Sequence, residues 1–490
     1  METLLHLCIY AMALGVVAVC AYDHIRGAVD ALSIRNIALV GFLIFMVLSA
    51  RGGLLYASES SYNLADPTGT VGKWLVWCLL FLVVFFASYR IGFGAPAIAR
   101  AIPTPRATVG FSSSWPLMIA LSIIALGLKV VPIPFVAALS GMTAIGCAGV
   151  AAGIAGWVWG PRLFNPAVAV PAAAIVGLNI AIANFGEFSR RPMVSVGIGM
   201  VWGMYFSSFR YMALPSMAFR IGLVAVPPLI LFSLYSSVRN WQVIGSTEIV
   251  NRMITQGDAT GSLEELGQQD TARVGQWLME YADRGAYETR PLFTVQYFFL
   301  FPVPRELLDA VGFEKPWPVS TQMADLSGRK GVKRGNTGVT NPAGIIGNAA
   351  VEGGLLAIVI YAALGAIVFR VADEYVKRGL HSAFLVLPVG SSLGQVMGIA
   401  RGETSVFMFN FVWTTFSVTV LMGIASAFVT KAFPQLKAGD EDAFGGGEWD
   451  EGDEYYVDDG NDPDAYRVWD IESANTDYAW YDETEHYTDK

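Results

Sequence analysis

The sequence predicts an all-α fold: a polytopic membrane helix bundle of about eleven transmembrane helices, with one large external loop and a disordered acidic C-terminal tail. Three observations predict it. Of the 490 residues, 54% are hydrophobic and only 15% are charged, which is too apolar for a soluble chain of this length. Apolar stretches of about 17 to 25 residues recur, each long enough to cross a hydrocarbon core of about 30 Å as a helix. A strongly acidic segment follows the last of them.

The apolar segments predict the transmembrane helices one by one. The first lacks a basic leader region and a small-residue cleavage site, so we expect a retained helix and not a removed signal peptide. The fourth and fifth are separated by VPIP (131–134) or continuous through it. The predicted segments are residues 3–22, 34–50, 73–94, 115–133, 134–158, 165–183, 193–209, 217–237, 345–369, 381–400 and 406–429.

These segments divide the chain into N-terminal transmembrane helices (1–237), a large loop (238–344), C-terminal transmembrane helices (345–430) and a tail (431–490). The first half of the loop mixes apolar and charged residues at helical spacing, which predicts amphipathic helices. TVQYFFLF (294–301) is too short to span and is expected to be re-entrant or interfacial. The glycine-rich basic stretch 327–344 resembles a substrate-covering loop. The predicted inward faces of the amphipathic helices are Ile244, Ile249, Val250, Val274, Trp277, Leu278 and Tyr281.

The charge distribution separates the tail from the body. From Asp440 onward nineteen acids face two bases, giving −17, so residues 1–439 carry +8. A basic membrane domain suits an anionic substrate or lipid, and the acidic chain as a whole gives no reason to expect a nucleic-acid partner. With the loop outside, thirteen Lys and Arg lie on the inner side and six in the short outer connections. This asymmetry predicts an external N-terminus, an external loop and a cytoplasmic tail.

Cysteine, histidine and the tail add weaker constraints. The four cysteines fall inside apolar segments and the four histidines are scattered, so neither a disulfide framework nor a zinc or haem site is indicated, and no cofactor is expected. The tail carries tyrosine and tryptophan among its acids and has no periodic apolar face. It is either a solubilising extension or a docking segment for a basic partner.

The first candidate group for chemistry is FPVPRELLDAVGFEKP (301–316). Arg305 and Lys315 lie beside Pro302, Pro304 and Pro316, whose fixed φ angles restrict the backbone around the cations. A guanidinium grips phosphate oxygens with two parallel hydrogen bonds and an ammonium adds a point charge, so the pair suits a diphosphate. In the alternative, Arg305 pairs with a neighbouring acid and fixes the loop.

The second group is TNPAGIIGNAAVEGG (340–354), where Asn341 is a candidate N-cap residue and Asn348 and Glu352 are spaced to share a helix face. A helix N-terminus offers free N–H groups to an anion, and an acid inside a spanning segment indicates a polar cavity. Its glycines equally allow close helix packing.

The third group is ARGETS (400–405), with Arg401 and Glu403, which is either part of a site or an ion-paired interfacial turn. Asn184, Glu187, Arg190 and Arg191 fall on the same predicted side. Cations gathered on the translocated side oppose the positive-inside tendency, which an anionic substrate there would explain. No Walker loop, dinucleotide fingerprint, nucleophile elbow or paired metal-binding acids occur, so ATP hydrolysis, hydride transfer and serine hydrolysis have no support.

These motifs, in this order, resemble the oligosaccharide repeat unit polymerases, or O-antigen polymerases of the Wzy type. The likeness covers most of residues 30 to 430. It rests on VPR (303–305) and EKP (314–316) at the end of the large loop, on TNPAGIIGNAAVEGG and on the late turn ARGETS. An early helix start, SIRNIALVGFLIF (33–45), is also similar to that family.

The resemblance implies a glycosyltransferase in the cytoplasmic (inner) membrane that builds a surface polysaccharide. A polyprenyl-diphosphate oligosaccharide would donate its glycan to a hydroxyl of a second lipid-linked repeat unit at the outer face, without a metal. Arg305 and Arg401 would then grip the diphosphate, Lys315 and Arg290 would assist, and Glu352 or Glu403 would orient or deprotonate the acceptor. Arg190, Arg191, Asn341 and Asn348 are further substrate-binding candidates. Other polysaccharide-assembly proteins are possible partners of the tail.

Three other functions remain open at this stage. An O-antigen-type ligase would transfer a finished glycan to a different acceptor and have a similar sequence. A transporter or flippase of lipid-linked oligosaccharides would place its charges near the midplane of broken helices. A noncatalytic membrane scaffold would act through the acidic tail.

Overall fold

The computed structural model describes residues 1–55, 62–105, 111–131, 137–185, 190–224, 271–287, 289–326 and 342–432. All regular secondary structure in these ranges is helical, as predicted. The predicted tail from residue 433 and the inward positions Ile244, Ile249 and Val250 lie outside them. The long helices are α1 (Glu2–Ile25), α4 (Pro67–Ile91), α6 (Phe111–Val130), α7 (Ala137–Trp159), α8 (Pro166–Ala183), α9 (Arg190–Ser207), α18 (Leu355–Lys377) and α21 (Thr404–Ala432).

Shorter helices connect these or pack on their ends. In the first half they are α2 (Ile34–Phe42), η1 (Leu43–Val47), η2 (Leu48–Arg51), α3 (Gly52–Leu55), α5 (Ala95–Ala101), η3 (Gly160–Arg162) and η4 (Phe209–Tyr211). In the second half they are α13 (Thr271–Asp283), α14 (Phe293–Leu300), α15 (Arg305–Ala310), α16 (Val319–Leu326), α17 (Gly344–Val351), α19 (Ala383–Gly390) and α20 (Leu393–Gly398).

Eight helices among the described residues are long and apolar enough to cross a membrane, so the chain is a helical membrane protein. Each overlaps one of the eleven predicted segments, the overlap with 345–369 beginning only at residue 355. They are Glu2–Ile25, Ile34–Leu55, Pro67–Ile91, Ser113–Val130, Ala138–Arg162, Pro166–Ala183, Leu355–Lys377 and Thr404–Lys431.

The other three predicted segments differ from this set. Residues 193–209 fall mainly in α9, which is less apolar, and residues 217–237 overlap a short apolar helix, Leu214–Val224. Residues 381–400 form two short helices, α19 and α20, interrupted at Ser391 and Ser392. The predicted segment 345–369 is also interrupted, because the chain turns at Gly353 (φ 132°) and Gly354 (φ 63°) before α18 begins.

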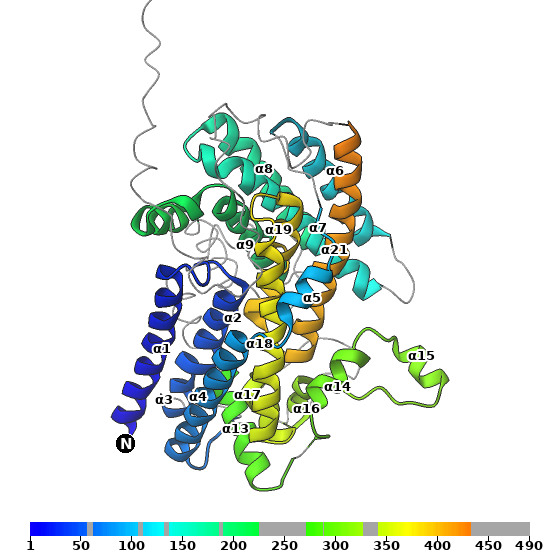
Figure 1. Cartoon of the computed structure of the whole chain (residues 1–490). Helices are drawn as coiled ribbons and strands as arrows, with labels where there is room; N and C mark the ends of the chain where they lie inside the picture. Colours follow the sequence, from blue (N-terminus) through cyan, green and yellow to red (C-terminus); the bar gives the residue numbers. More distant parts are fainter. Residues whose placement is uncertain are drawn as a thin grey trace, which may run out of the picture.

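The helices form two adjoining groups (Figure 1). One group contains α1, α2, α4, α13, α17 and α18, and the other contains α6, α7, α8, α9, α19 and α21. Short helix α20 contacts α2 in the first group and both α9 and α21 in the second. The interrupted segment α19–α20 therefore joins the two groups.

Helices α7 and α9 pack backbone to backbone through glycines. A Cβ added at Gly203 would overlap the carbonyl oxygen of Gly153, and one at Gly156 would overlap that of Met200. Small residues allow such close approach, which stabilises helix pairs in lipid, where apolar burial alone supplies little.

The span Ile34–Leu55 changes helix type within the first group. After α2 it widens into the π-helical turn η1 and then tightens into the 3₁₀ turn η2. The Met46 carbonyl in this π-turn accepts a hydrogen bond from the Trp74 indole N–H at 2.8 Å. The irregular backbone is therefore satisfied from α4, as an apolar interior requires.

Helix α13, from the predicted loop, is buried along most of its length. Val274, Trp277 and Leu278 lie in a small core and Tyr281 packs beside it, as the amphipathic pattern predicted. On another side, the Glu280 carboxylate accepts hydrogen bonds from the backbone N–H groups of Ala65 (2.9 Å) and Asp66 (3.1 Å), just ahead of α4. The loop helix is thus part of the first helix group.

The α7–α9 contact makes a direct prediction for stability. Gly203→Val would force these helices apart because a carbonyl oxygen blocks the new side chain, at a cost of about 1 to 3 kcal/mol. Gly197→Val on the same helix is the control, since nothing lies within 4 Å of its added Cβ. Thermal unfolding in detergent should show a lower Tm for the first variant only. Equal Tm values for the two variants would contradict the packing.

Candidate functional site

Glu352 lies at the interruption between α17 and α18, outside the candidate span, and its side chain is fully buried. Its carboxylate accepts hydrogen bonds from the Thr294 N–H (2.6 Å), the Thr294 hydroxyl (3.0 Å) and the Tyr361 hydroxyl. The Glu352 carbonyl also accepts from the Leu292 N–H at 2.8 Å. The acid therefore holds the first turn of α14 against the break in the spanning segment.

Glu403 immediately precedes α21 and is also buried. One carboxylate oxygen accepts from the Ser320 N–H in the first turn of α16 at 3.0 Å, and the other from the Asn348 side-chain amide at 3.4 Å. Asn348, which is 1% exposed, connects α17 to this acid. The predicted polar residues of the second and third motifs thus meet in space.

The two acids affect each other and a shared tyrosine. Burial raises the pKa of Glu352 to about 7 against the hydrogen bonds from Tyr361 and Thr294, and the Glu403 charge adds to the rise. Burial likewise raises the pKa of Glu403. Burial, followed by the charges of Glu403 and Glu352, raises the pKa of Tyr287. The Tyr287 hydroxyl donates to Gln322 of α16 at 2.5 Å, the same helix whose first turn is bound by Glu403.

The side chains of Arg305 and Lys315 both donate hydrogen bonds to backbone carbonyls of their own loop. The Lys315 ammonium donates to the carbonyls of Phe301 (2.8 Å) and Val303 (2.7 Å). The Arg305 guanidinium donates to the Lys315 carbonyl at 3.0 Å and stacks 3.7 Å from the centre of the Trp317 ring. Burial, followed by the Arg305 charge, lowers the pKa of Lys315. These contacts close the segment 301–317 into a loop, and the prediction that the two cations bind a diphosphate is not tested by them.

The other predicted cations differ in position. Arg401, two residues before Glu403, is half-buried with its guanidinium 5.4 Å from the Phe45 ring. Arg290 is exposed, two residues before Leu292 and thus close in sequence to the α14 turn that Glu352 holds. Arg190 and Arg191 open α9, but their side chains fall outside the described part.

Asn341 also lies outside the described residues. The expectation that it caps the following helix was wrong, because α17 begins at Gly344 with Ala343 in the N-cap position. Gly344 has φ +69° there, and a side chain at that position would meet Met46 and the Ala400 carbonyl. Close contact with the π-turn therefore sets where the helix starts.

Sequence reasoning missed the partners of the acids. Four of these partners carry no motif of their own, although one of them opens the segment 294–301 that the sequence analysis expected to be re-entrant or interfacial: Thr294, Ser320, Tyr361 and Tyr287. Arg273 was also missed, although it is only 4% exposed on α13. Its one available signal is the i, i+3, i+7 spacing of Arg273, Gln276 and Glu280, which places three polar side chains on one face of α13.

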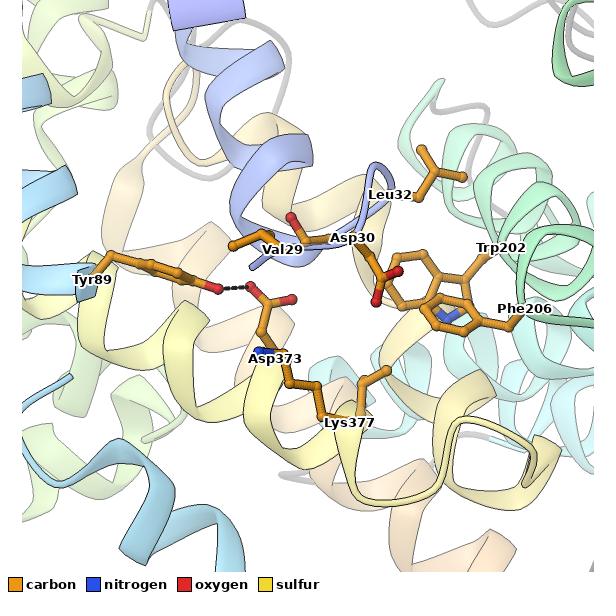
Figure 2. Close-up of a pocket in the computed structure, with 10 residues that line it drawn as sticks. Val29, Asp30, Leu32, Tyr89, Trp202, Phe206, Asp373 and Lys377 are labelled. Carbon is orange, nitrogen blue, oxygen red and sulfur yellow. Dashed lines mark hydrogen bonds between the residues drawn. The ribbon is translucent and has the colours of Figure 1, made fainter. Parts of the chain in front are cut away.

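A second buried polar centre lies at the other end of α18, around Asp373. Its carboxylate accepts from the N–H groups of Ile34 (2.8 Å) and Arg35 (3.2 Å) at the start of α2, and from the Tyr89 hydroxyl (2.6 Å). Figure 2 shows Tyr89 pointing to Asp373 across from Trp202 and Phe206. The enclosed volume is about 10 Å³, room for about one water molecule. This centre is too small for a sugar or lipid and joins α2, α4 and α18.

The same centre explains the helix start SIRN. The Ser33 hydroxyl accepts from the Asn36 N–H at 3.1 Å, and Arg35 pairs with Asp23 at 2.6 Å. Both are buried. This motif therefore stabilises the junction of α1 and α2, away from Glu352 and Glu403.

No metal centre is indicated: the described ranges hold no group of three or more His, Cys, Asp or Glu side chains able to bind an ion. Comparison with known proteins finds no matching family model, curated protein or solved structure.

The raised pKa of Glu352 predicts a pH-dependent stability. The folded carboxyl keeps its proton up to about pH 7, whereas the unfolded one loses it near 4.5. The folded state thus binds more protons between these values, and the free energy of unfolding falls as pH rises through them. At 1.36 kcal/mol per pH unit the fall amounts to about 3 kcal/mol.

Thermal unfolding in detergent between pH 4.5 and 8 tests this. We expect the Tm of the wild-type protein to fall up to about pH 7 and then level off, and Glu352→Gln to lack most of that fall. The exposed Glu306→Gln variant serves as control and should follow the wild type. If Glu352→Gln parallels the wild type, the assignment is wrong.

Proposed function

We propose that the protein is a membrane glycosyltransferase that polymerises polyprenyl-diphosphate-linked oligosaccharide repeat units at the outer membrane face. One observation carries the proposal: the segments that flank VPR and EKP meet the second and third motifs, whereas the early helix start SIRN lies apart from them. The loop on either side of VPR and EKP binds Glu352 through Thr294 and Glu403 through Ser320. Asn348, from the second motif, contacts Glu403 from the third. Segments that are about 60 to 110 residues apart thus form one buried polar site.

The transfer needs a base for the acceptor and a stabilised leaving group. The acceptor oxygen forms a bond to the anomeric carbon while the bond from that carbon to the diphosphate breaks, and the hydroxyl proton passes to a carboxylate. The diphosphate leaves with the bonding electron pair, and nearby cations stabilise the negative charge. No metal is required for these steps.

Glu403 is the better base of the two acids. All three hydrogen bonds to the Glu352 carboxylate are at 3.0 Å or less, which suits a fixed anchor for α14. The oxygen of Glu403 that faces Asn348 is held at 3.4 Å, a weak contact that an acceptor hydroxyl can replace. Burial raises the pKa of Glu403, which makes its carboxylate a stronger base. Asn348 then orients the acceptor.

In this proposal the cations have two roles: some bind the diphosphate, and Lys315 holds the loop in place. Arg401 is next to Glu403 in the same turn, and Arg290 is exposed near the α14 turn, so both suit the diphosphate. Arg305 uses one nitrogen on the Lys315 carbonyl and, in this proposal, turns its other N–H groups to the phosphate. Lys315 supports Arg305 by closing the loop.

A lipid-linked oligosaccharide carrier is the second candidate, because one observation favours it. Helices α19 and α20 break at Ser391 and Ser392 in the interior, as discontinuous helices of transporters do. Within the described part, two buried side-chain oxygens beside this break have no hydrogen-bond partner: those of Ser195, which lies against Gly394, and of Gln395. Such oxygens suit a transported polar group or a coupling cation.

Purified protein in liposomes with labelled polyprenyl-diphosphate oligosaccharide discriminates these functions. A ladder of products on a gel identifies a polymerase. A single shifted product on a foreign acceptor identifies a ligase, and movement of label across the bilayer without product identifies a carrier.

In this assay Glu403→Gln should lower polymer formation about 100-fold or more, since a general base contributes that much. Arg401→Ala and Arg305→Ala should abolish polymer without loss of membrane insertion. Arg284→Ala is the matched control, an exposed arginine that pairs with Glu280 away from the site. Wild-type ladders from Glu403→Gln and both arginine variants, in correctly inserted protein, would exclude the assignment.

A further inference from the structure

The loop segment 299–316, here called the arm, projects sideways from the helix groups and carries α15 (Figure 1). It exposes four large apolar side chains: Phe299 (68% exposed), Leu307 (54%), Val311 (75%) and Phe313 (38%). Exposed apolar side chains this close together indicate an interaction surface. The proposed transfer reaction makes no use of them.

The arm has a defined shape at both ends. At its base, the Lys315 ammonium near the end of the arm donates hydrogen bonds to the carbonyls of Phe301 and Val303 near its beginning. At its tip, α15 is followed by Gly312, which has a positive φ of 73°. The Gly312 N–H donates a hydrogen bond to the Asp309 carbonyl at 3.0 Å, and the Phe313 N–H donates one to the Leu308 carbonyl at 2.9 Å. This pair of bonds is a Schellman motif. The apolar side chains are therefore presented by a fixed structure.

The two sides of α15 differ in polarity. Leu307 and Val311 are four residues apart and share one side, whereas the exposed acids Glu306 and Asp309 lie on another. The segment 302–316 carries three acids and two bases, so its charge gives no attraction to an anionic surface. Its partner is expected to be apolar.

The root of the arm lies against a membrane span. The rings of Phe298 and Phe301 pack on Phe409 of α21, with centroids 5.6 and 5.5 Å apart. Phe409 lies five residues inside the candidate span Thr404–Lys431, and its ring stacks with Trp413 deeper in the span at 6.3 Å. The aromatic root of the arm is therefore continuous with α21, which exposes the apolar side chains of Val412 and Phe416.

From this continuity we infer that the arm inserts the side bearing Leu307 and Val311 into the lipid bilayer beside α21. Glu306 and Asp309 remain at the level of the headgroups. The partner is the hydrocarbon of the surrounding membrane, as for interfacial amphipathic helices. The inference does not depend on the proposed catalytic activity.

Fluorescence quenching in nanodiscs that each hold one copy of the full chain tests it. Cys8 and Cys20 are replaced by serine, because their side chains are at least partly exposed and would react with the label. Cys78 and Cys147 are buried and are left in place. An environment-sensitive fluorophore is attached at Val311→Cys or, as the matched control, at Asp309→Cys. Lipids carrying nitroxides on their acyl chains should quench the first probe at least about twofold more than the second, with blue-shifted emission at the first.

Three outcomes would overturn the inference. Unquenched, water-like emission at position 311 would show that lipid does not cover the arm and would leave it for a protein partner. Equal quenching at 309 and 311 would contradict a lipid-facing side. In a Val311→Glu background, a probe at Leu307→Cys should lose its quenching; unchanged quenching there would show that these side chains do not hold the arm in lipid.

Discussion

The fold depends on buried carboxylates that bind free backbone N–H groups at the start of distant helices. Asp373 does so for α2, Glu352 for α14 and Glu403 for α16, and Glu280 binds the two N–H groups just ahead of α4. The first N–H groups of a helix have no partner within it and carry the positive end of the helix dipole. Where no water reaches, a carboxylate from another element is a strong way to satisfy them. These contacts hold the short helices in place against the long ones.

The eight spans could be predicted from the sequence because length and apolar composition determine them. The interruptions could not. Residues 345–369 and 381–400 are apolar on average, so hydropathy averaged over a span-length window does not show the turn at Gly353 and Gly354 or the bend at Ser391 and Ser392. Each break depends on tertiary partners, such as the Thr289 N–H on the Val351 carbonyl at 3.0 Å. The π-turn could not be predicted from the sequence either, because no local residue pattern indicates it.

The acids of the candidate site were predictable, and their partners were not. An acid beside a spanning segment is costly unless satisfied, which singled out Glu352, and the charged turn singled out Glu403. Thr294 and Ser320 each contribute a backbone N–H group to these acids, and Thr294 adds its hydroxyl. Any residue type but proline has that group, so the sequence holds no sign of the role. The contacts of Arg305 and Lys315 fix the loop through backbone carbonyls and the Trp317 ring, whereas the alternative had paired Arg305 with an acid. The diphosphate remains a proposal.

The π-turn at Leu43–Val47 gives the span Ile34–Leu55 one residue more than an α-helix would need. Because a π-turn closes over more residues than an α-turn, this extra residue is absorbed locally, and the side chains beyond it keep nearly the orientation that a continuous α-helix would give them. Phe45, which lies under the Arg401 guanidinium, and the Met46 carbonyl, which binds Trp74, depend on this local winding. A single-residue deletion within the π-turn would therefore disturb these two contacts while leaving the rest of the span in place.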